Sequence, residues 1–167
     1  MESEILQRSI LELFREENKF TFHIRSYSMW PSLRPGDRVI CRRTTVDFPE
    51  SGSLILMNLG HICVIHRLIE CGNSAQGRFL ITKGDNTIYP DSSWQTSACL
   101  GKVIYIQRND QMIDLTRVDK LLGGKWISTL SRLQARISSQ PNGIIRRILL
   151  SALRRMVNLS ALIIYRI

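Results

Sequence analysis

The central part of this 167-residue chain consists of short β-type runs separated by close turn signals. The runs within residues 20–111 are FTFHIRS, RVICRR, SLILMNL, HICVIHRLIE, RFLITKG and KVIYIQR, and breaks such as ESG and ECGNSAQG fall between them. Short strands joined by turns, with no helical pattern between them, argue against a βαβ domain. The pattern predicts a mainly β fold, either an antiparallel sheet or a small barrel.

The break Arg34-Pro35-Gly36-Asp37 predicts a particular turn. Proline presets φ for the first central position of a type II turn, and glycine supplies the positive φ that the second central position needs. We therefore expect this turn to deliver Asp37 into the following strand.

Helical patterns flank the β-rich part. Residues 3–16 place apolar side chains on one face, which predicts a short amphipathic helix. Residues 119–139 also have a helical pattern, and Pro141-Asn142-Gly143 breaks the chain before a last helix from Ile144 to about Ile164. The predicted organisation is an N-terminal helix over 1–18, a β-rich domain over 19–118 and a helical extension over 119–167.

The positive charge of the chain is concentrated in that extension. Residues 1–120 hold 15 Lys and Arg against 14 Asp and Glu, whereas residues 121–167 hold 8 Lys and Arg and no acid. A uniformly basic domain would indicate nucleic acid. A near-neutral body with a cationic, apolar tail suits a membrane surface or an acidic partner at least as well, so we expect no nucleic-acid partner.

The last helix is amphipathic, with an apolar face that is much broader than its polar one. Its polar residues form a narrow stripe, made of Arg147, Ser151, Arg154, Arg155 and Asn158. A broad apolar face holds Ile145, Ile148, Leu149, Ala152, Met156, Leu159 and Ile163. Interior arginines argue against a spanning helix. Two readings stay open with equal weight: the helix lies in a membrane interface, or it docks on the domain or on a partner chain.

Neither the N-terminal residues nor the cysteine content predicts export. Glu2 and Glu4 interrupt the N-terminal apolar residues, which match neither a signal peptide nor a membrane anchor. The cysteines lie far apart without metal-ligand spacing, at positions 41, 63, 71 and 99. We expect free thiols in a reducing compartment, no metal, no cofactor, and a cytoplasmic or peripherally membrane-associated protein.

One segment carries a candidate for chemistry. Ser26-Tyr27-Ser28-Met29-Trp30-Pro31-Ser32-Leu33, followed by Pro35-Gly36-Asp37, resembles the S-x-S-M-x-P-[ST]-L…GD box of the signal peptidase and LexA-like serine protease clan. Three further pieces follow in the order of that clan: VIHRLI at 64–69, TKGDN at 82–86 with Asp91, and GKV at 101–103. Each piece alone is weak, but four in order make a strong match.

The resemblance implies a role for each matching residue. Ser28 would be the nucleophile, Ser26 would help to stabilise the oxyanion, and Met29 and Pro31 would shape the substrate-facing turn. His66 stands at the position of the general base. A histidine there, and the short stretch that follows it, resemble the compact branch of endoplasmic-reticulum and archaeal signal peptidases.

The acid that orients His66 stays open between two residues. Asp85 and Asp91 both qualify, but the spacing GDNTIYPD departs from the usual GDNN-x-x-D-D form, and we favour Asp85 by a small margin. Lys83 is an alternative base, because a desolvated lysine serves that role in much of the clan. Its place before Gly-Asp matches a structural lysine, so we leave it out of the catalytic set.

The expected function is that of a serine endopeptidase that cleaves a precursor, leader or signal peptide through an acyl-enzyme intermediate. The N-terminal membrane segment usual in signal peptidases does not precede Ser28, which weakens a housekeeping secretory role. Two alternatives remain. One is an inactive peptide- or membrane-binding module on the same fold; the other, a LexA-like self-cleaving regulator, is disfavoured because His66 replaces its lysine.

Overall fold

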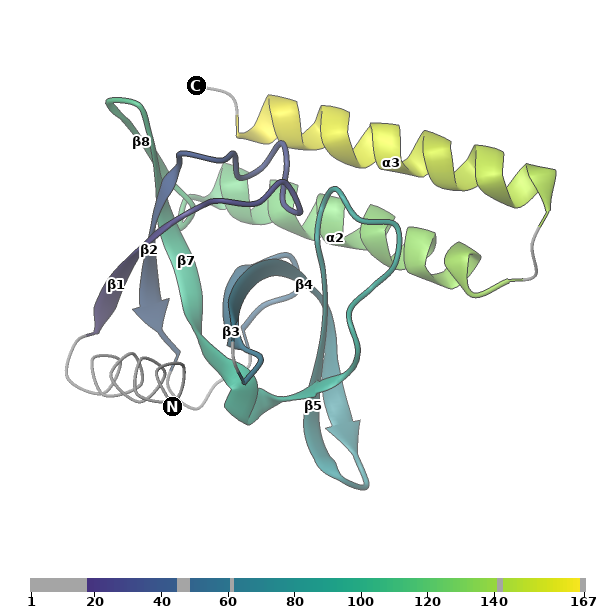
Figure 1. The fold of residues 1–167 in the computed structure, drawn as a ribbon, viewed down its shortest axis with the longest axis horizontal. Coiled ribbons are helices and arrows are strands. Elements are labelled where there is room, and N and C mark those ends of the chain that lie inside the picture. The colour runs from purple at the N-terminus through teal and green to yellow at the C-terminus, as the bar shows by residue number, and fades with distance from the viewer. Residues whose placement is uncertain (1–17, 45–48, 61, 141–142, 166–167) are drawn as a thin grey trace.

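The computed structural model describes residues 18–44, 49–60, 62–140 and 143–165. The strands in these ranges form one antiparallel sheet in the order β1-β2-β7-β3-β4-β5-β6, and β8 pairs with β7 (Figure 1). Their bounds are β1 Lys19–His23, β2 Arg38–Arg43, β3 Leu54–Asn58, β4 Cys63–Ser74, β5 Gly77–Lys83, β6 Trp94–Gln95, β7 Cys99–Arg108 and β8 Gln111–Asp114. The predicted antiparallel sheet is confirmed.

The sheet curls into a half-barrel (Figure 1). Irregular register accompanies the curl, with shifts between Ile40 and Cys41 and between Leu56 and Met57. A third shift falls on β4, between Leu68 and Glu70. Bulges of this kind increase local twist and bend the strand that carries them. The fold is mainly β, with 36% of residues in strands and 32% in helices.

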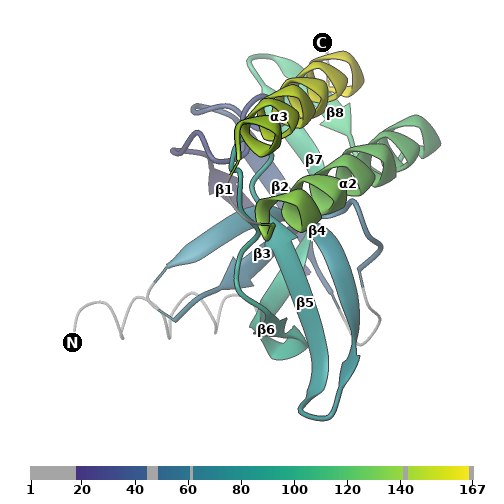
Figure 2. The same ribbon diagram turned by 90° about the vertical axis from the view of Figure 1, so that its right-hand side faces the viewer.

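Two helices follow the sheet, α2 over Val118–Ser138 and α3 over Ile144–Ile164, as the sequence predicts. They run side by side and lie together against one side of the sheet (Figures 1 and 2). The helix predicted over 3–16 lies outside the described residues. Within the described ranges, neither helix is long and apolar enough to cross a bilayer.

The helices share a core with the sheet. Ile127 of α2 and Val157 of α3 are fully buried in the same hydrophobic cluster as Val39 of β2 and Leu56 of β3. Burial of such side chains stabilises a fold by roughly 1.5 to 3 kcal/mol each. Residues 118–165 therefore pack on the β-rich part, and the helical extension is not held by a core of its own.

Glycines allow a close approach between α2 and the turn before β3. A Cβ on Gly52 would lie 2.4 Å from the carbonyl carbon of Gly124, closer than any real side chain allows. Gly52 also has a φ of +93°, which favours glycine. This contact brings α2 against the chain that leads into β3 and β4, the strand that carries His66.

The turn predicted at Arg34-Pro35-Gly36-Asp37 is present. The Asp37 amide donates to the Arg34 carbonyl at 2.9 Å, and Gly36 has a φ of +95°. Asp37 is buried and accepts hydrogen bonds from the side chain of Arg108. The turn closes the loop from 24 to 37, which contains the Ser28 segment.

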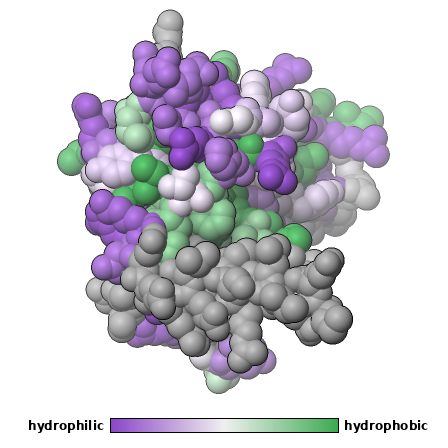
Figure 3. Space-filling view, turned by 60° about the vertical axis from the view of Figure 1, so that its left-hand side comes forward, coloured by the Kyte–Doolittle hydropathy of each residue, from purple (hydrophilic) through white to green (hydrophobic). Residues whose placement is uncertain are grey.

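The surface of the molecule mixes polar and apolar side chains. Figure 3 shows one face on which hydrophobic residues gather near the centre, below a group of hydrophilic ones. Exposed apolar side chains are normal singly, but groups of them mark places where a ligand or partner docks.

Candidate active site

The segment that carries Ser28 is held by buried anchors on both sides of the serine. Met29 and Leu33 are buried in the main hydrophobic cluster. The Trp30 amide donates to the Tyr27 carbonyl, and the Leu33 amide donates to the Met29 carbonyl, which makes one helix-like turn. Ser28 itself is only half-buried. The turn thus presents the Ser28 hydroxyl at the surface from a firmly packed base.

His66 lies on β4 within hydrogen-bond distance of that hydroxyl. The distance from His66 Nε2 to Ser28 Oγ is 3.2 Å. His66 Nδ1 lies 2.6 Å from Asp91 Oδ2. A carboxylate at Nδ1 favours the tautomer with the proton on Nδ1, which leaves Nε2 free to accept the serine proton. Ser28, His66 and Asp91 therefore form a continuous chain of hydrogen bonds.

Asp91 is held in place by β5. Its amide donates to the Thr82 carbonyl at 2.8 Å, and the Thr82 hydroxyl donates to Asp91 Oδ2 at 2.5 Å. The side chains of His66 and Asp91 are 12% and 25% exposed, so solvent only partly screens the pair. Thr82 is a positioning residue that the sequence analysis did not single out.

Ser26 lies next to the proposed nucleophile. The two hydroxyl oxygens of Ser26 and Ser28 are 3.2 Å apart. A hydroxyl at this distance can donate to an oxygen that becomes negative beside Ser28.

Asp85, the favoured partner of His66 in the sequence analysis, points elsewhere. Its carboxylate accepts hydrogen bonds from Arg67 Nε at 2.8 Å and Arg67 Nη2 at 2.6 Å, and from the Ser32 hydroxyl at 2.5 Å. Both Arg67 and Asp85 are fully buried. The structure places Asp91 against His66, because the fully buried Arg67 on the same strand captures the Asp85 carboxylate.

This buried ion pair ties the site to the end of α3. Arg67 Nη1 donates to the Gly52 carbonyl at 2.7 Å and to the Tyr165 hydroxyl at 3.2 Å. Burial, the largest single effect, would lower the pKa of Arg67, but the charges and hydrogen bonds of Asp85 and Tyr165 together outweigh it and raise that pKa. The pair fixes Ser32, four residues after Ser28, through hydrogen bonds from both directions.

Asn86 clamps the Ser28 turn from the other side. Its amide donates to the Ser28 carbonyl at 2.8 Å, and its side-chain Nδ2 donates to the Tyr27 carbonyl at 3.1 Å. Arg154 of α3 in turn donates to Asn86 Oδ1 at 2.7 Å. A Cβ on Gly84 would come within 2.7 Å of the Ser28 carbonyl oxygen, so glycine is needed there. Asn86 thus holds the Ser28 turn through both its backbone N–H and its side-chain amide.

Lys83 is buried beside this box. Its Nζ donates to the Gly84 carbonyl at 3.1 Å. Burial lowers the pKa of Lys83 to about 8, although the Asp85 charge opposes the shift. The Ser28 hydroxyl lies within hydrogen-bond distance of His66 Nε2, whereas the Lys83 ammonium lies against the backbone of Gly84.

A groove of about 350 Å³ opens next to Ser28. Its polar lining residues are His23, Arg25, Ser26, Ser28 and Cys63. Apolar side chains line the rest, namely Phe22, Ile24, Met29, Leu33, Leu56, Ile62, Val64 and Ile65. Pro31 is buried and is not among the lining residues. A largely apolar groove with a few polar groups is typical of a ligand site.

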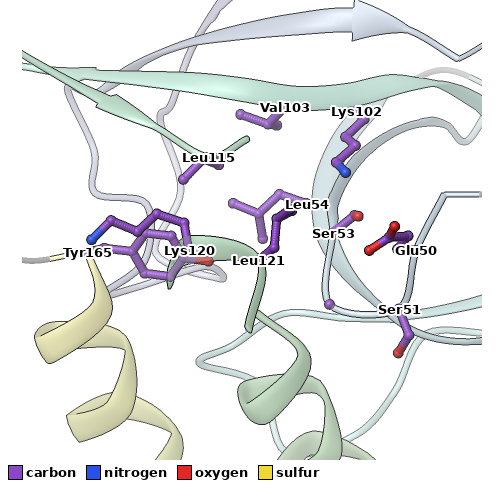
Figure 4. Close-up of a pocket in the computed structure, with 11 residues that line it drawn as sticks. Glu50, Ser51, Ser53, Leu54, Lys102, Val103, Leu115, Lys120, Leu121 and Tyr165 are labelled. Carbon is purple, nitrogen blue, oxygen red and sulfur yellow. The ribbon is translucent and has the colours of Figure 1, made fainter. Parts of the chain in front are cut away.

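A second cavity lies between the start of β3, β7, the start of α2 and Tyr165 (Figure 4). It measures about 20 Å³, room for roughly one water molecule. None of its lining residues borders the Ser28 groove. This cavity is therefore too small for a ligand much larger than a water molecule.

The four cysteines are free thiols. Cys63 is exposed and lines the Ser28 groove, whereas Cys41 is buried, and burial raises its pKa to about 12. Burial also raises the pKa of Cys63, so it is exposure that makes Cys63 the thiol most accessible to a reagent near the site.

Comparison with known proteins leaves the family open. No protein-family model matches the chain. No curated protein is significantly similar to it in sequence.

Proposed function

We propose that the chain is a serine endopeptidase of the signal-peptidase type, with Ser28 as nucleophile, His66 as general base and Asp91 as the residue that orients His66. The observation that carries the proposal is the chain of hydrogen bonds from Ser28 through His66 to Asp91, at 3.2 and 2.6 Å. A serine hydroxyl needs such a base to become nucleophilic near neutral pH.

The reaction proceeds by acyl transfer. Ser28 Oγ forms a bond to the carbonyl carbon of the substrate while His66 Nε2 takes its proton, and Ser26 donates a hydrogen bond to the oxyanion. Collapse of this intermediate breaks the C–N bond, and the leaving amine takes the proton from His66. Water then attacks the acyl ester with His66 as base again, which releases the carboxylate product and Ser28.

The substrate class is an extended peptide. Residues 63–66 of β4 pair with β3, and in the described ranges β5 pairs with β4 only from Arg67 onward. Beside His66, β4 therefore has a stretch of edge along the groove to which a peptide strand can add. Apolar lining side chains supply pockets for its apolar residues. A precursor, leader or signal peptide has this chemistry.

Cleavage assays test the proposal directly. Candidate precursors and a peptide library are incubated with wild type, Ser28→Ala and His66→Ala, and the products are read by mass spectrometry. Ser93→Ala and Arg38→Ala, at exposed positions that do not line the groove, are matched controls. We expect cleavage by wild type and both controls, and none by the two site variants. Equal cleavage by wild type and Ser28→Ala would refute the assignment.

A pH profile distinguishes the two candidate bases. An imidazole base keeps activity down to about pH 7. The pKa of Lys83 is about 8 because burial lowers it, so a lysine base would lose activity as the pH falls below 8. We expect the imidazole profile, together with retained activity in Lys83→Met. A Lys83→Met variant that is folded but inactive would indicate that Lys83, and not His66, is the general base.

A further inference from the structure

The outer faces of α2 and α3 are apolar. Of the fifteen large hydrophobic side chains that are exposed in the described ranges, eleven lie on these two helices. We call them the helical face: Val118, Leu122, Trp126, Leu133, Ile144, Ile145, Ile148, Leu149, Met156, Leu159 and Ile163. The remaining four are scattered over the β-rich part, so the clustering is specific to the helices.

Helix α3 is apolar on two sides. Leu150, Leu153, Val157 and Ala161 are buried, and a different row points outward. Ile148, for example, is 63% exposed, and Ile163 is 75% exposed. The broad apolar face predicted from the sequence is thus exposed. The narrower row of buried residues packs α3 against the rest of the protein. Docking on the domain uses only part of the apolar surface of α3.

The two helices contribute to one surface. Trp126 Nε1 of α2 donates to the Ser160 hydroxyl of α3 at 3.2 Å, which brings Trp126 next to the outward row of α3. The helices run side by side along the same side of the molecule (Figures 1 and 2). Each has 21 residues and is therefore about 30 Å long. A surface of this length suits an extended, flat partner.

The charge around this surface selects the partner. Helix α2 carries one acid, the exposed Asp119 in its first turn, and residues 121–167 carry 8 Lys and Arg and no acid. Arg147 and Arg155 of α3 are exposed. A second copy would bring arginines against arginines, which is repulsive. An anionic lipid surface satisfies both features, because its headgroups attract the arginines and its acyl boundary accepts the apolar side chains.

We infer that the helical face binds an anionic phospholipid surface, with α2 and α3 lying along the lipid–water boundary. Arg154, on the polar stripe of α3, donates to Asn86, and the Asn86 amide donates to the Ser28 carbonyl. The docked helix is therefore joined to the Ser28 turn through Asn86. The inference does not depend on proteolysis and holds for an inactive protein of this fold.

Vesicle sedimentation tests the inference. Purified full-length protein is mixed with vesicles of phosphatidylcholine alone or with one quarter phosphatidylglycerol. We expect the wild type to sediment with the anionic vesicles and much less with the neutral ones, and added salt to weaken the binding. Each arginine near such a surface contributes roughly fivefold to the partition coefficient. Arg147→Gln/Arg155→Gln should therefore lower it about 25-fold.

Variants on the helical face separate apolar insertion from charge. Ile148→Gln/Leu159→Gln should abolish sedimentation, whereas the exposed Met112→Gln of β8 and Arg38→Gln of β2 are matched controls and should bind as wild type. Circular dichroism and thermal unfolding confirm that each variant is folded. Trp126, 52% exposed, should shift its fluorescence to the blue with anionic vesicles, and Trp126→Phe should remove most of that shift.

Three results would overturn the inference. The first is a folded wild type that fails to bind anionic vesicles. The second is an Ile148→Gln/Leu159→Gln variant that binds them as wild type does. The third is a stable dimer in solution that Ile148→Gln/Leu159→Gln converts to monomer while vesicles remain unbound. That outcome would assign the helical face to a second copy of the chain.

Discussion

Replacing Asp85 by asparagine should destabilise the fold, whereas the same change at Asp91 should chiefly affect catalysis. Asp85 and its partner Arg67 are fully buried, and both carboxylate oxygens of Asp85 accept hydrogen bonds from the guanidinium. Asparagine removes the negative charge and turns one acceptor into an NH₂ donor. That donor then faces donors from Arg67 and Ser32, which leaves a buried positive charge without compensation.

The expected magnitude follows from this burial. Removing one partner of a buried ion pair costs about 3 to 5 kcal/mol. For a chain of this size, 1 kcal/mol corresponds to roughly 2 to 4 °C in Tm, so Asp85→Asn should melt roughly 6 to 20 °C lower than wild type. Urea titration measures the free energy of unfolding, and calorimetry measures Tm. Because Arg67 keeps its hydrogen bonds to Gly52 and Tyr165, the loss of stability should lie near the lower end of this range.

Asp91→Asn is the matched comparison. The Asp91 side chain is 25% exposed and accepts hydrogen bonds from His66 and Thr82, so its loss should cost only about 1 kcal/mol of stability. Its effect on kcat should be about 10⁴-fold, as expected when the orienting acid of a histidine base is neutralised. An Asp85→Asn variant that melts within about 2 °C of wild type would refute the reasoning on the ion pair.

Three further predictions concern residues around the site. Lys83→Met should stabilise the fold at pH 7, because burial lowers the pKa of Lys83 to about 8 and an unfolded lysine binds its proton up to about pH 10.5. Urea titrations should show that the free energy of unfolding of wild type rises from pH 8 to 10. The difference in this free energy between Lys83→Met and wild type should shrink over the same range; a constant difference would contradict the prediction. A maleimide should block peptide cleavage through the exposed Cys63, and Cys63→Ser should keep activity after treatment; inhibition of Cys63→Ser would place the reactive thiol elsewhere. Asn86→Ala should lower kcat roughly 10- to 100-fold through misplacement of the Ser28 turn, with stability near that of wild type; unchanged kcat would remove Asn86 from the positioning set.

Much of the fold can be predicted because local rules agree with it. The short β-type runs became antiparallel strands, and the helical patterns at 119–139 and 144–164 became α2 and α3 within one residue of their expected bounds. The turn at Arg34–Asp37 follows from proline and glycine alone. What the pattern could not predict is the curl of the sheet, which accompanies register shifts at residues with no local signal.

The candidate site was only partly predictable. Ser28 and His66 are 38 positions apart in sequence, and the resemblance of their motifs suggested that they meet. The choice between Asp85 and Asp91 could not be made from spacing, because it depends on where the buried Arg67 finds its counter-charge. Arg67 looks in the sequence like an ordinary surface residue of a strand. The long charged residues at 67 and 83 are fully buried here, which pattern alone does not reveal.

The amino-acid sequence by itself determines the order of strands and helices, the turn before β2, the concentration of positive charge after residue 120 and the presence of a serine and a histidine in matching motifs. Those features are local, since each depends on residues close together in the chain. The tertiary structure alone decides which carboxylate reaches His66 and which apolar row of α3 stays exposed. Both depend on competition between distant groups for the same buried space, and only the packed chain resolves that competition.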